Sequence, residues 1–126
     1  MTKKNIFISG ASRGIGKSMA EHFAKSNFNV VGTSRNNFKF DNDLENLFPI
    51  KLDVTSRNDV KDCFDELKSK NLLPDILINN AGITADQLFL RMSDDDWDNV
   101  INTNLTGTFN LTKIFLKNMI KNKFGR

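Results

Sequence analysis

The sequence is poor in several residue types that particular kinds of site require. It contains one cysteine and one histidine, which excludes a disulfide framework and an ordinary zinc site. No apolar run approaches the roughly 18 residues that a membrane span needs. Basic residues exceed acidic residues only by 18 to 15, and they do not cluster with aromatic residues as nucleic-acid binding requires. We therefore expect no metal site, no membrane span and no nucleic-acid partner, in a reducing, cytoplasmic setting.

The length and composition indicate one domain. A chain of 126 residues, 39% of them hydrophobic, can bury a modest core but leaves little room for a second domain. We find no internal repeat and no low-complexity linker, so residues 1–126 are treated as one unit. Tyrosine is absent, against eleven phenylalanines, and this absence bears on catalysis below.

Short apolar runs alternate with longer amphipathic stretches along the chain. The apolar runs predict strands over residues 6–9, 29–34, 49–54 and 74–82. The amphipathic stretches predict helices over residues 15–25, 56–70 and 93–123. The polar segment 36–48 predicts a loop with a short helix. Because alternating strands and helices form parallel sheets with right-handed crossovers, we expect an α/β fold built on an open, doubly wound parallel sheet.

The predicted helices have recognisable ends and faces. Ser56 and Ser93 are expected to cap the second and third helices. In the first helix, Ile15, Met19 and Phe23 lie four residues apart and predict its buried face. The long helix is expected to bury a wide apolar face, made of Trp97, Val100, Ile101, Leu105, Thr108, Phe109, Thr112, Phe115, Leu116 and Met119. Cys63 is expected in the core and His22 in solvent.

A glycine-rich loop joins the first strand to the first helix. It consists of Gly10, Ala11, Ser12, Arg13, Gly14, Ile15 and Gly16. A glycine after the strand permits a sharp turn, and glycines at the helix start let a phosphate approach the backbone N–H groups. The other candidate segments, 33–36, 53–54 and 79–84, also follow strands, where doubly wound sheets bind ligands. This pattern predicts a dinucleotide site.

The same loop also fits a relaxed P-loop pattern. In that alternative Lys17 reaches the phosphates, Ser18 binds magnesium and Asp53 holds the metal. The first glycine of that pattern is replaced by Ala11. A P-loop-type nucleotide-binding protein therefore stands as an alternative.

The residues after the second strand distinguish between the two nicotinamide cofactors. An NAD site usually has an acidic residue there to bind the ribose 2′-hydroxyl. Here residues 33–40 contain no acid, and Arg35 occupies the expected place while Arg13 projects from the glycine loop. Guanidinium groups bind a phosphate through forked, charge-assisted hydrogen bonds. The sequence therefore predicts NADP(H) as the cofactor rather than NAD(H).

Four motifs carry a resemblance to a known family. SGASRGIG, LDVTS, INNAG and NTNLTGTF occur in this order and spacing, and together they resemble a classical short-chain dehydrogenase/reductase. The stretch 79–109 is most similar to the bacterial 3-oxoacyl-[acyl-carrier-protein] reductases of fatty-acid biosynthesis. The resemblance covers essentially all 126 residues but only the N-terminal half of that family's length. It implies a Rossmann-like fold, truncated after four strands and the long helix in the fifth position.

The resemblance also implies residue roles and partners. Gly10, Ala11, Ser12 and Arg13 would line the NADPH phosphates with Ile15 beneath, and Arg35 would meet the 2′-phosphate. Asp53 and Val54 would edge the adenine, and Asn80, Ala81 and Gly82 would pass the adenosine-side ribose. Asn104 would be the catalytic asparagine, which bends its helix and holds a water. The implied partners are a 3-ketoacyl group on acyl carrier protein and further copies of the chain in a dimer or tetramer.

Three features of the long helix have structural interpretations beside the functional ones. Asn104 lies on an otherwise apolar stripe, so its amide is expected to be satisfied by backbone or water. Gly107 is costly inside a helix, and the close approach of another helix would explain it. The basic residues Lys121, Lys123 and Arg126 either dock an acidic carrier protein or complement the helix dipole.

The sequence departs from the family in its catalytic residues. Ketone reduction in the family uses a Tyr that donates a proton, a Lys four residues later and a Ser, but this sequence has no tyrosine. Only Asn104 of the catalytic set is present. We therefore expect an N-terminal fragment that does not reduce ketones by itself and whose fourth strand is an exposed apolar edge. The alternatives are a non-catalytic NADP-binding fragment and another short-chain reductase.

Overall fold

A four-stranded parallel sheet forms the centre of the fold. The computed structural model describes residues 3–126. Its strands are β1 (Asn5–Ile8), β2 (Asn29–Ser34), β3 (Leu47–Lys51) and β4 (Ile76–Ile78). They lie in the order β3-β2-β1-β4, and Phe7 of β1 pairs with Val31 on one side and Leu77 on the other. The crossover order and parallel pairing confirm the predicted doubly wound α/β fold.

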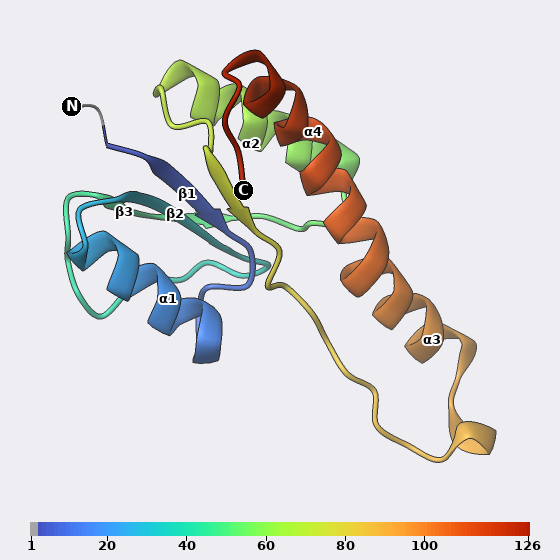
Figure 1. Cartoon of the computed structure of the whole chain (residues 1–126). Coiled ribbons are helices and arrows are strands. Elements are labelled where there is room, and N and C mark those ends of the chain that lie inside the picture. The colour runs from blue at the N-terminus through green and yellow to red at the C-terminus, as the bar shows by residue number, and fades with distance from the viewer. Residues whose placement is uncertain (1–2) are drawn as a thin grey trace.

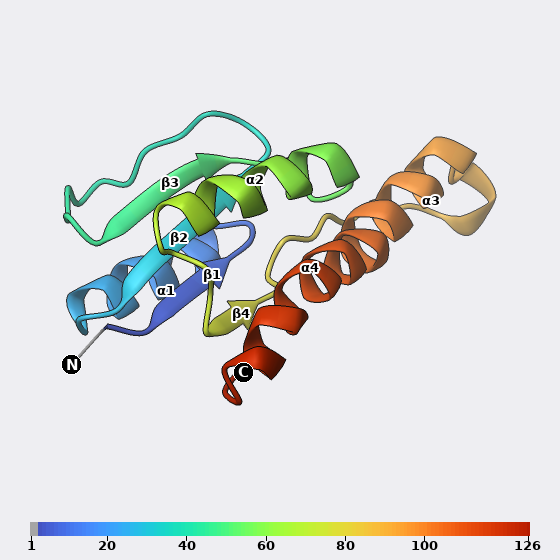
Figure 2. The ribbon, with the colours of Figure 1, turned by 90° about the horizontal axis from the view of Figure 1, so that it is seen from above.

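Helices cover both faces of this sheet (Figures 1 and 2). The helix α1 (Gly14–Lys25) lies on one face, and α2 (Arg57–Ser69) and α4 (Gly107–Lys121) lie on the other. Side chains alternate along β1, so Phe7 packs under α2 and α4 while Ile6 and Ile8 pack under α1. Cys63 is buried in the first of these two cores, as predicted.

The buried face of α1 differs from the prediction. Ile15 is 74% exposed, whereas the fully buried positions are Gly16, Ala20 and Ala24. These small residues lie four apart and let the helix approach the sheet closely. Met19 and Phe23, each one position before an alanine, pack only at the side of this contact. The spacing of the large apolar residues therefore indicated roughly the correct side of α1, but it did not identify the residues that lie closest to the sheet.

The segment between β2 and β3 contains bends but no helix, so the short helix predicted there is wrong. Phe40 in this segment packs against Gly32 of β2, where an added Cβ would lie 2.7 Å from the phenyl ring. The Asn46 amide donates hydrogen bonds to Ala24 O at 2.7 Å and Phe28 O at 2.6 Å. These tertiary contacts hold the segment in place without a helical turn.

The long helical pattern is one rod with a π-helical turn in its middle. It comprises α3 (Asp94–Ile101), the π-helical segment Asn102–Thr106 and α4. Ser93 caps α3 by accepting a hydrogen bond from Asp96 N, and Ser56 caps α2 by accepting one from Asp59 N. Both caps were predicted.

The predicted apolar face of this rod is largely wrong. Its buried positions are Thr103, Gly107, Asn110, Leu111 and Phe115, while Trp97, Leu105, Phe109 and Leu116 are exposed. The π-turn changes the phase of the helix at its centre. Only the half after that turn packs on the sheet and α2, and α3 projects beyond them (Figures 1 and 2).

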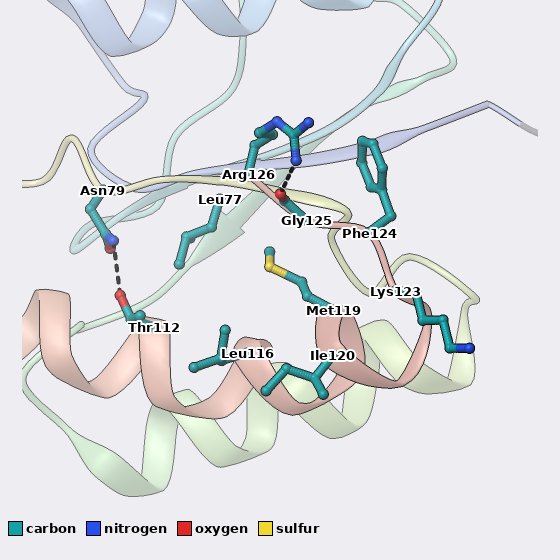
Figure 3. Close-up of a pocket in the computed structure, with 10 residues that line it drawn as sticks. All are labelled: Leu77, Asn79, Thr112, Leu116, Met119, Ile120, Lys123, Phe124, Gly125 and Arg126. Atoms are coloured by element: carbon teal, nitrogen blue, oxygen red, sulfur yellow. Dashed lines mark hydrogen bonds between the residues drawn. The ribbon is translucent and has the colours of Figure 1, made fainter.

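The strand β4 is the last strand on one side of the sheet, as predicted, but it is not the exposed edge that was expected, because its three residues are half-buried. Beside it, Arg126 N donates to Asp75 O at 3.2 Å and Arg126 O accepts from Leu77 N at 2.8 Å, so the backbone of Arg126 pairs in parallel with β4. A cavity of about 580 Å³ lies next to this pairing, between β4 and α4 (Figure 3). Its apolar wall includes Leu77, Leu116 and Met119. Among the described residues, no helix has the length and apolarity needed to cross a membrane.

Candidate functional site

A cavity of about 590 Å³ opens at the carboxyl ends of the strands. It gathers residues from five separate parts of the chain. Its lining residues are Gly10, Ser12, Arg13, Gly14, Thr33, Ser34, Arg35, Asn36, Leu52, Val54, Asn80, Ala81, Gly82, Ile83 and Thr103. An adjoining cavity of about 490 Å³ adds Thr84 and Asn104. The structure thus brings together nine of the predicted cofactor residues in one cavity and Asn104 beside it.

Four predicted residues lie outside that lining. Ala11 is fully buried, Gly16 is buried in α1, and Ile15 projects into solvent from the first turn of α1. Asp53 is partly exposed next to Val54. A further groove of about 1190 Å³ between α2 and α4 contains none of the predicted cofactor residues.

The glycines of the first loop have different physical roles. Gly10 and Gly14 have φ values of 68° and 61°, a conformation that other residues rarely adopt. A Cβ at Gly10 would lie 2.9 Å from Ala81 Cα, whereas a Cβ at Gly14 would meet nothing within 4 Å. Gly16 has ordinary helical backbone, but its Cβ would lie 2.0 Å from Gly10 O. Close packing of α1 on the loop therefore requires Gly16.

The start of α1 suits an anionic group. Its N-cap residue, Arg13, makes no side-chain capping hydrogen bond, and its first turn contains no acidic residue. The free N–H groups of this turn and the helix dipole favour negative charge. The open space beside Gly14 leaves room for a phosphate to approach. The donor set and shape of the loop therefore fit a dinucleotide diphosphate.

Ser9 joins this loop to the turn after β4. Its buried hydroxyl accepts hydrogen bonds from Asn80 N at 3.1 Å and Ala81 N at 3.0 Å. The Asn80 amide donates in turn to Gly10 O at 2.9 Å. These bonds hold two walls of the cavity at a fixed separation. Ser9 was not among the predicted site residues, although a polar residue at the end of a buried strand was a signal for such a contact.

Arg35 and Asp53 follow the carboxyl ends of β2 and β3. Arg35 Nη2 donates to Thr103 Oγ1 at 3.3 Å. Asp53 Oδ1 accepts from Thr55 N at 3.0 Å and Thr55 Oγ1 at 2.7 Å. Burial opposes the ionisation of Asp53, but the hydrogen bonds from Thr55 and the charge of Arg35 outweigh it and lower its pKa. The carboxylate is therefore available as an acceptor at neutral pH.

Asn104 bonds to the backbone at the opposite end of the cavity. Its Oδ1 accepts from Ile83 N at 2.8 Å, and its Nδ2 donates to Ile83 O at 3.0 Å. The predicted backbone partner is confirmed, but the predicted burial is wrong because Asn104 is exposed. Its place in the π-helical turn explains the difference, since that turn directs the side chain to the 83–84 loop rather than into the core.

Gly107 contacts the β3–α2 loop and not another helix. A Cβ there would lie 2.5 Å from Val54 Cγ2. One turn further along, Asn110 Nδ2 donates to Val54 O at 3.0 Å in a buried hydrogen bond. The expected close approach is present, but its partner is Val54, which lines the cavity. This contact fixes α4 relative to the carboxyl end of β3.

The residues of the P-loop alternative point elsewhere. The Lys17 ammonium pairs with the Asp41 carboxylate in the β2–β3 segment, and this pairing raises the pKa of Lys17. Ser18 is exposed. Neither residue lines the cavity. Residues 3–126 also contain no group of three side chains suited to hold a metal ion.

The fold and the glycine-loop cavity define a Rossmann-type dinucleotide-binding protein. The short chain dehydrogenase family profile matches residues 4–126, and the chain belongs to this family. That membership excludes the P-loop alternative.

Several named proteins are similar to the chain. The 3-oxoacyl-[acyl-carrier-protein] reductase of Buchnera aphidicola subsp. Baizongia pistaciae is 42% identical over 130 residues, which are 99% of this chain and 53% of that protein. The reductase of Escherichia coli K12 is 37% identical over 127 residues, 98% of this chain and 52% of that protein. The chain therefore spans about half the length of these relatives.

Solved structures agree with the family assignment. ElxO with NADP bound superposes with a TM-score of 0.89 at 36% identity, over 98% of this chain and 53% of that one. A 4-hydroxyisoleucine dehydrogenase complexed with NADH gives a TM-score of 0.86 at 34% identity, over 97% and 52%.

Proposed function

We propose that this chain forms the NADP(H)-binding half of an oxidoreductase that reduces a 3-oxoacyl group carried by acyl carrier protein. The main support for the cofactor is that Arg13 and Arg35 line one cavity with the glycine loop. No acidic residue follows β2 before Asp41, so nothing there would repel a 2′-phosphate. ElxO binds NADP and the 4-hydroxyisoleucine dehydrogenase binds NADH, which supports a nicotinamide dinucleotide in general.

Each part of the cavity would hold one part of the cofactor. The N–H groups of the 10–16 loop would bind the diphosphate, with Ile15 at its edge, and Arg13 and Arg35 would bind the 2′-phosphate. Asp53 would accept a hydrogen bond from the adenine amine beside Val54. The turn of Asn80, Ala81 and Gly82 would pass the adenosine-side ribose. When bound, NADPH supplies the hydride for ketone reduction.

Asn104 has a positioning contact that suits the nicotinamide end. Its amide holds both backbone groups of Ile83, so it would keep the 82–84 loop in place beside the cofactor. We also propose that it binds a water of the proton relay, the role that the family resemblance implies. The 126 residues contain no tyrosine, so ketone reduction by these residues alone is not expected.

The substrate and partners follow from the names of the relatives. The similar reductases act on 3-oxoacyl groups of acyl carrier protein, so an acidic carrier is the proposed partner of the basic residues Lys121, Lys123 and Arg126. The exposed apolar side chains of Trp97, Leu105 and Phe109 suit contact with another copy of the chain, and we expect a cytoplasmic oligomer. The alternative is an NADP-binding protein without catalysis.

Binding of the reduced dinucleotides tests the proposal. We expect the nicotinamide fluorescence of NADPH to report tighter binding than that of NADH. Arg35→Ala should weaken NADPH binding roughly 10- to 100-fold, the value of charge-assisted hydrogen bonds, and leave NADH almost unchanged. Arg91→Ala, at the exposed end of the short 3₁₀ helix Phe89–Arg91 and outside the cavity, is the matched control. Equal affinity of the wild-type chain for NADPH and NADH would refute the NADP assignment.

Turnover tests an expectation that both candidate functions share, namely that these residues alone do not reduce ketones. The chain is mixed with NADPH and a short 3-ketoacyl thioester, and NADPH absorbance is followed. Binding without oxidation supports an NADP-binding half whose proton donor is not among these residues. Oxidation of NADPH would contradict the expected lack of activity.

A further inference from the structure

The π-helical turn places one buried hydroxyl against the cofactor-selecting arginine. Thr103 is 5% exposed, and its Oγ1 accepts the hydrogen bond from Arg35 Nη2 at 3.3 Å. The two residues are 68 positions apart in the sequence, and both line the cavity at the carboxyl ends of the strands. No family motif quoted above assigns a role to Thr103.

Thr103 lies near two contacts that join its helix to the β3–α2 loop. Gly107, four residues later, contacts Val54, and Asn110 donates to Val54 O. Thr103, Gly107 and Asn110 are all buried, so these contacts restrict the position of the Thr103 hydroxyl relative to the β3–α2 loop. The neighbouring Asn104 points instead to Ile83. The π-helical turn thus contacts two different loops of the cavity, the one after β2 through Thr103 and the one after β4 through Asn104.

Arg35 needs such a support because it is exposed. Its long side chain has many rotamers, and ordering them opposes ligand binding. Its guanidinium has five N–H donors, so a hydrogen bond to Thr103 leaves enough donors for a phosphate. The carboxylate of Asp53 lies on the same rim and attracts Arg35, although no ion pair joins them among residues 3–126. Without Thr103, the guanidinium would be free to turn toward this carboxylate.

We propose that Thr103 is a positioning residue for cofactor selection: its buried hydroxyl holds the Arg35 guanidinium over the cavity, so that a 2′-phosphate meets an oriented pair of donors. This inference rests on the proposed NADP(H) function. It extends that function by assigning part of the selectivity to the π-helical turn rather than to the residues that follow β2.

Two adenosine phosphates isolate the 2′-phosphate from the rest of the cofactor. Adenosine 2′,5′-bisphosphate and adenosine 5′-monophosphate are titrated into the 126-residue chain by calorimetry. Thr103→Val keeps the size of the side chain and removes the hydroxyl. We expect it to weaken the bisphosphate about three- to tenfold, the value of one hydrogen bond, and the monophosphate less than about twofold. Thr103→Ser should restore the wild-type ratio of affinities.

Two controls separate positioning from general support of the fold. Thr106→Val makes the same change in the same turn at a residue outside the cavity lining, and it should alter neither affinity. In an Arg35→Ala background, Thr103→Val should cause no further loss, since Thr103 acts through Arg35. If the valine variant lacks native circular dichroism, Thr103→Ala against Thr103→Ser makes the comparison, because these two differ only in the hydroxyl.

The possible results have distinct meanings. An equal loss for both ligands shows that Thr103 supports the fold and overturns the inference, as does no loss for either. The inference is also overturned if Thr103→Val weakens bisphosphate binding in the Arg35→Ala background as much as it does in the wild-type chain. Equal affinity of the wild-type chain for the two ligands would instead refute the proposed NADP selectivity itself, and it would appear before any Thr103 variant is measured.

Discussion

Gly107→Ala is expected to destabilise the chain although the same change stabilises an ordinary helix. Alanine gains about 1 kcal/mol over glycine in a helix interior. Here the new Cβ would lie 2.5 Å from Val54 Cγ2 and 3.2 Å from Val54 Cβ. Val54 is buried and β-branched, and Asn110 holds its carbonyl, so it has little freedom to move. Overpacking of this kind costs about 1–3 kcal/mol. Because Val54 has little freedom to move, we take the upper part of that range, about 2–3 kcal/mol, which leaves a net loss of about 1–2 kcal/mol.

A double-mutant cycle identifies the cause. Val54→Ala removes the Cγ2 methyl group that the new Cβ would approach most closely, and we expect it to destabilise the chain by about 1–3 kcal/mol by itself. In that background Gly107→Ala should be neutral or stabilising, which corresponds to a coupling of about 2 kcal/mol. The free energy of unfolding is measured by urea titration with circular dichroism. Because Val54 lines the cavity, the Gly107→Ala variant, which displaces Val54, should also bind NADPH more weakly.

Two results would refute the reasoning. A higher unfolding midpoint for Gly107→Ala in the wild-type background would mean that helix propensity outweighs the contact with Val54. An equal loss in both backgrounds would mean that the destabilisation arises from a different neighbour.

Two further predictions concern titratable groups. Burial, with a smaller contribution from Glu66, raises the pKa of Cys63 to about 12, so the folded chain should react slowly with an aromatic disulfide reagent at pH 8 and rapidly in urea; rapid reaction of the folded chain would contradict this. The lowered pKa of Asp53 means that its ionised form stabilises the fold above its unfolded pKa of about 3.9. The stability difference between wild type and Asp53→Asn should therefore be constant near neutral pH and shrink as pH falls through the folded pKa. A difference that grows on acidification would show the opposite sign.

Local sequence patterns predicted the elements of the fold well. Each predicted strand overlaps an observed one, because buried strands read as short apolar runs. Ser56 and Ser93 were found as caps because a capping bond spans only three residues. The glycine loop was found because its turn and helix start are also local. These signals were sufficient for the order of elements and for the class of ligand site.

The faces of the helices were harder to predict. Apolar residues occur on several sides of the helical rod 93–123, and their spacing in the sequence does not show which side packs on the sheet. The π-helical turn shifts the phase in its middle, so a single periodic face does not describe both halves. In α1, the closest contact uses glycine and alanine, which carry a weak hydrophobic signal compared with Ile15.

The amino-acid sequence by itself determined the strand and helix order, the phosphate-type loop and the presence of Arg35 where other cofactor sites have an acid. Only the tertiary structure decided how these parts meet: Ser9 against Ala81, Asn104 against Ile83, and Thr103 against Arg35. The physical reason is the range of the interactions. Capping and turn formation depend on neighbours along the chain, whereas a hydrogen bond between residues 68 positions apart exists only after the sheet has brought its strand ends to one edge.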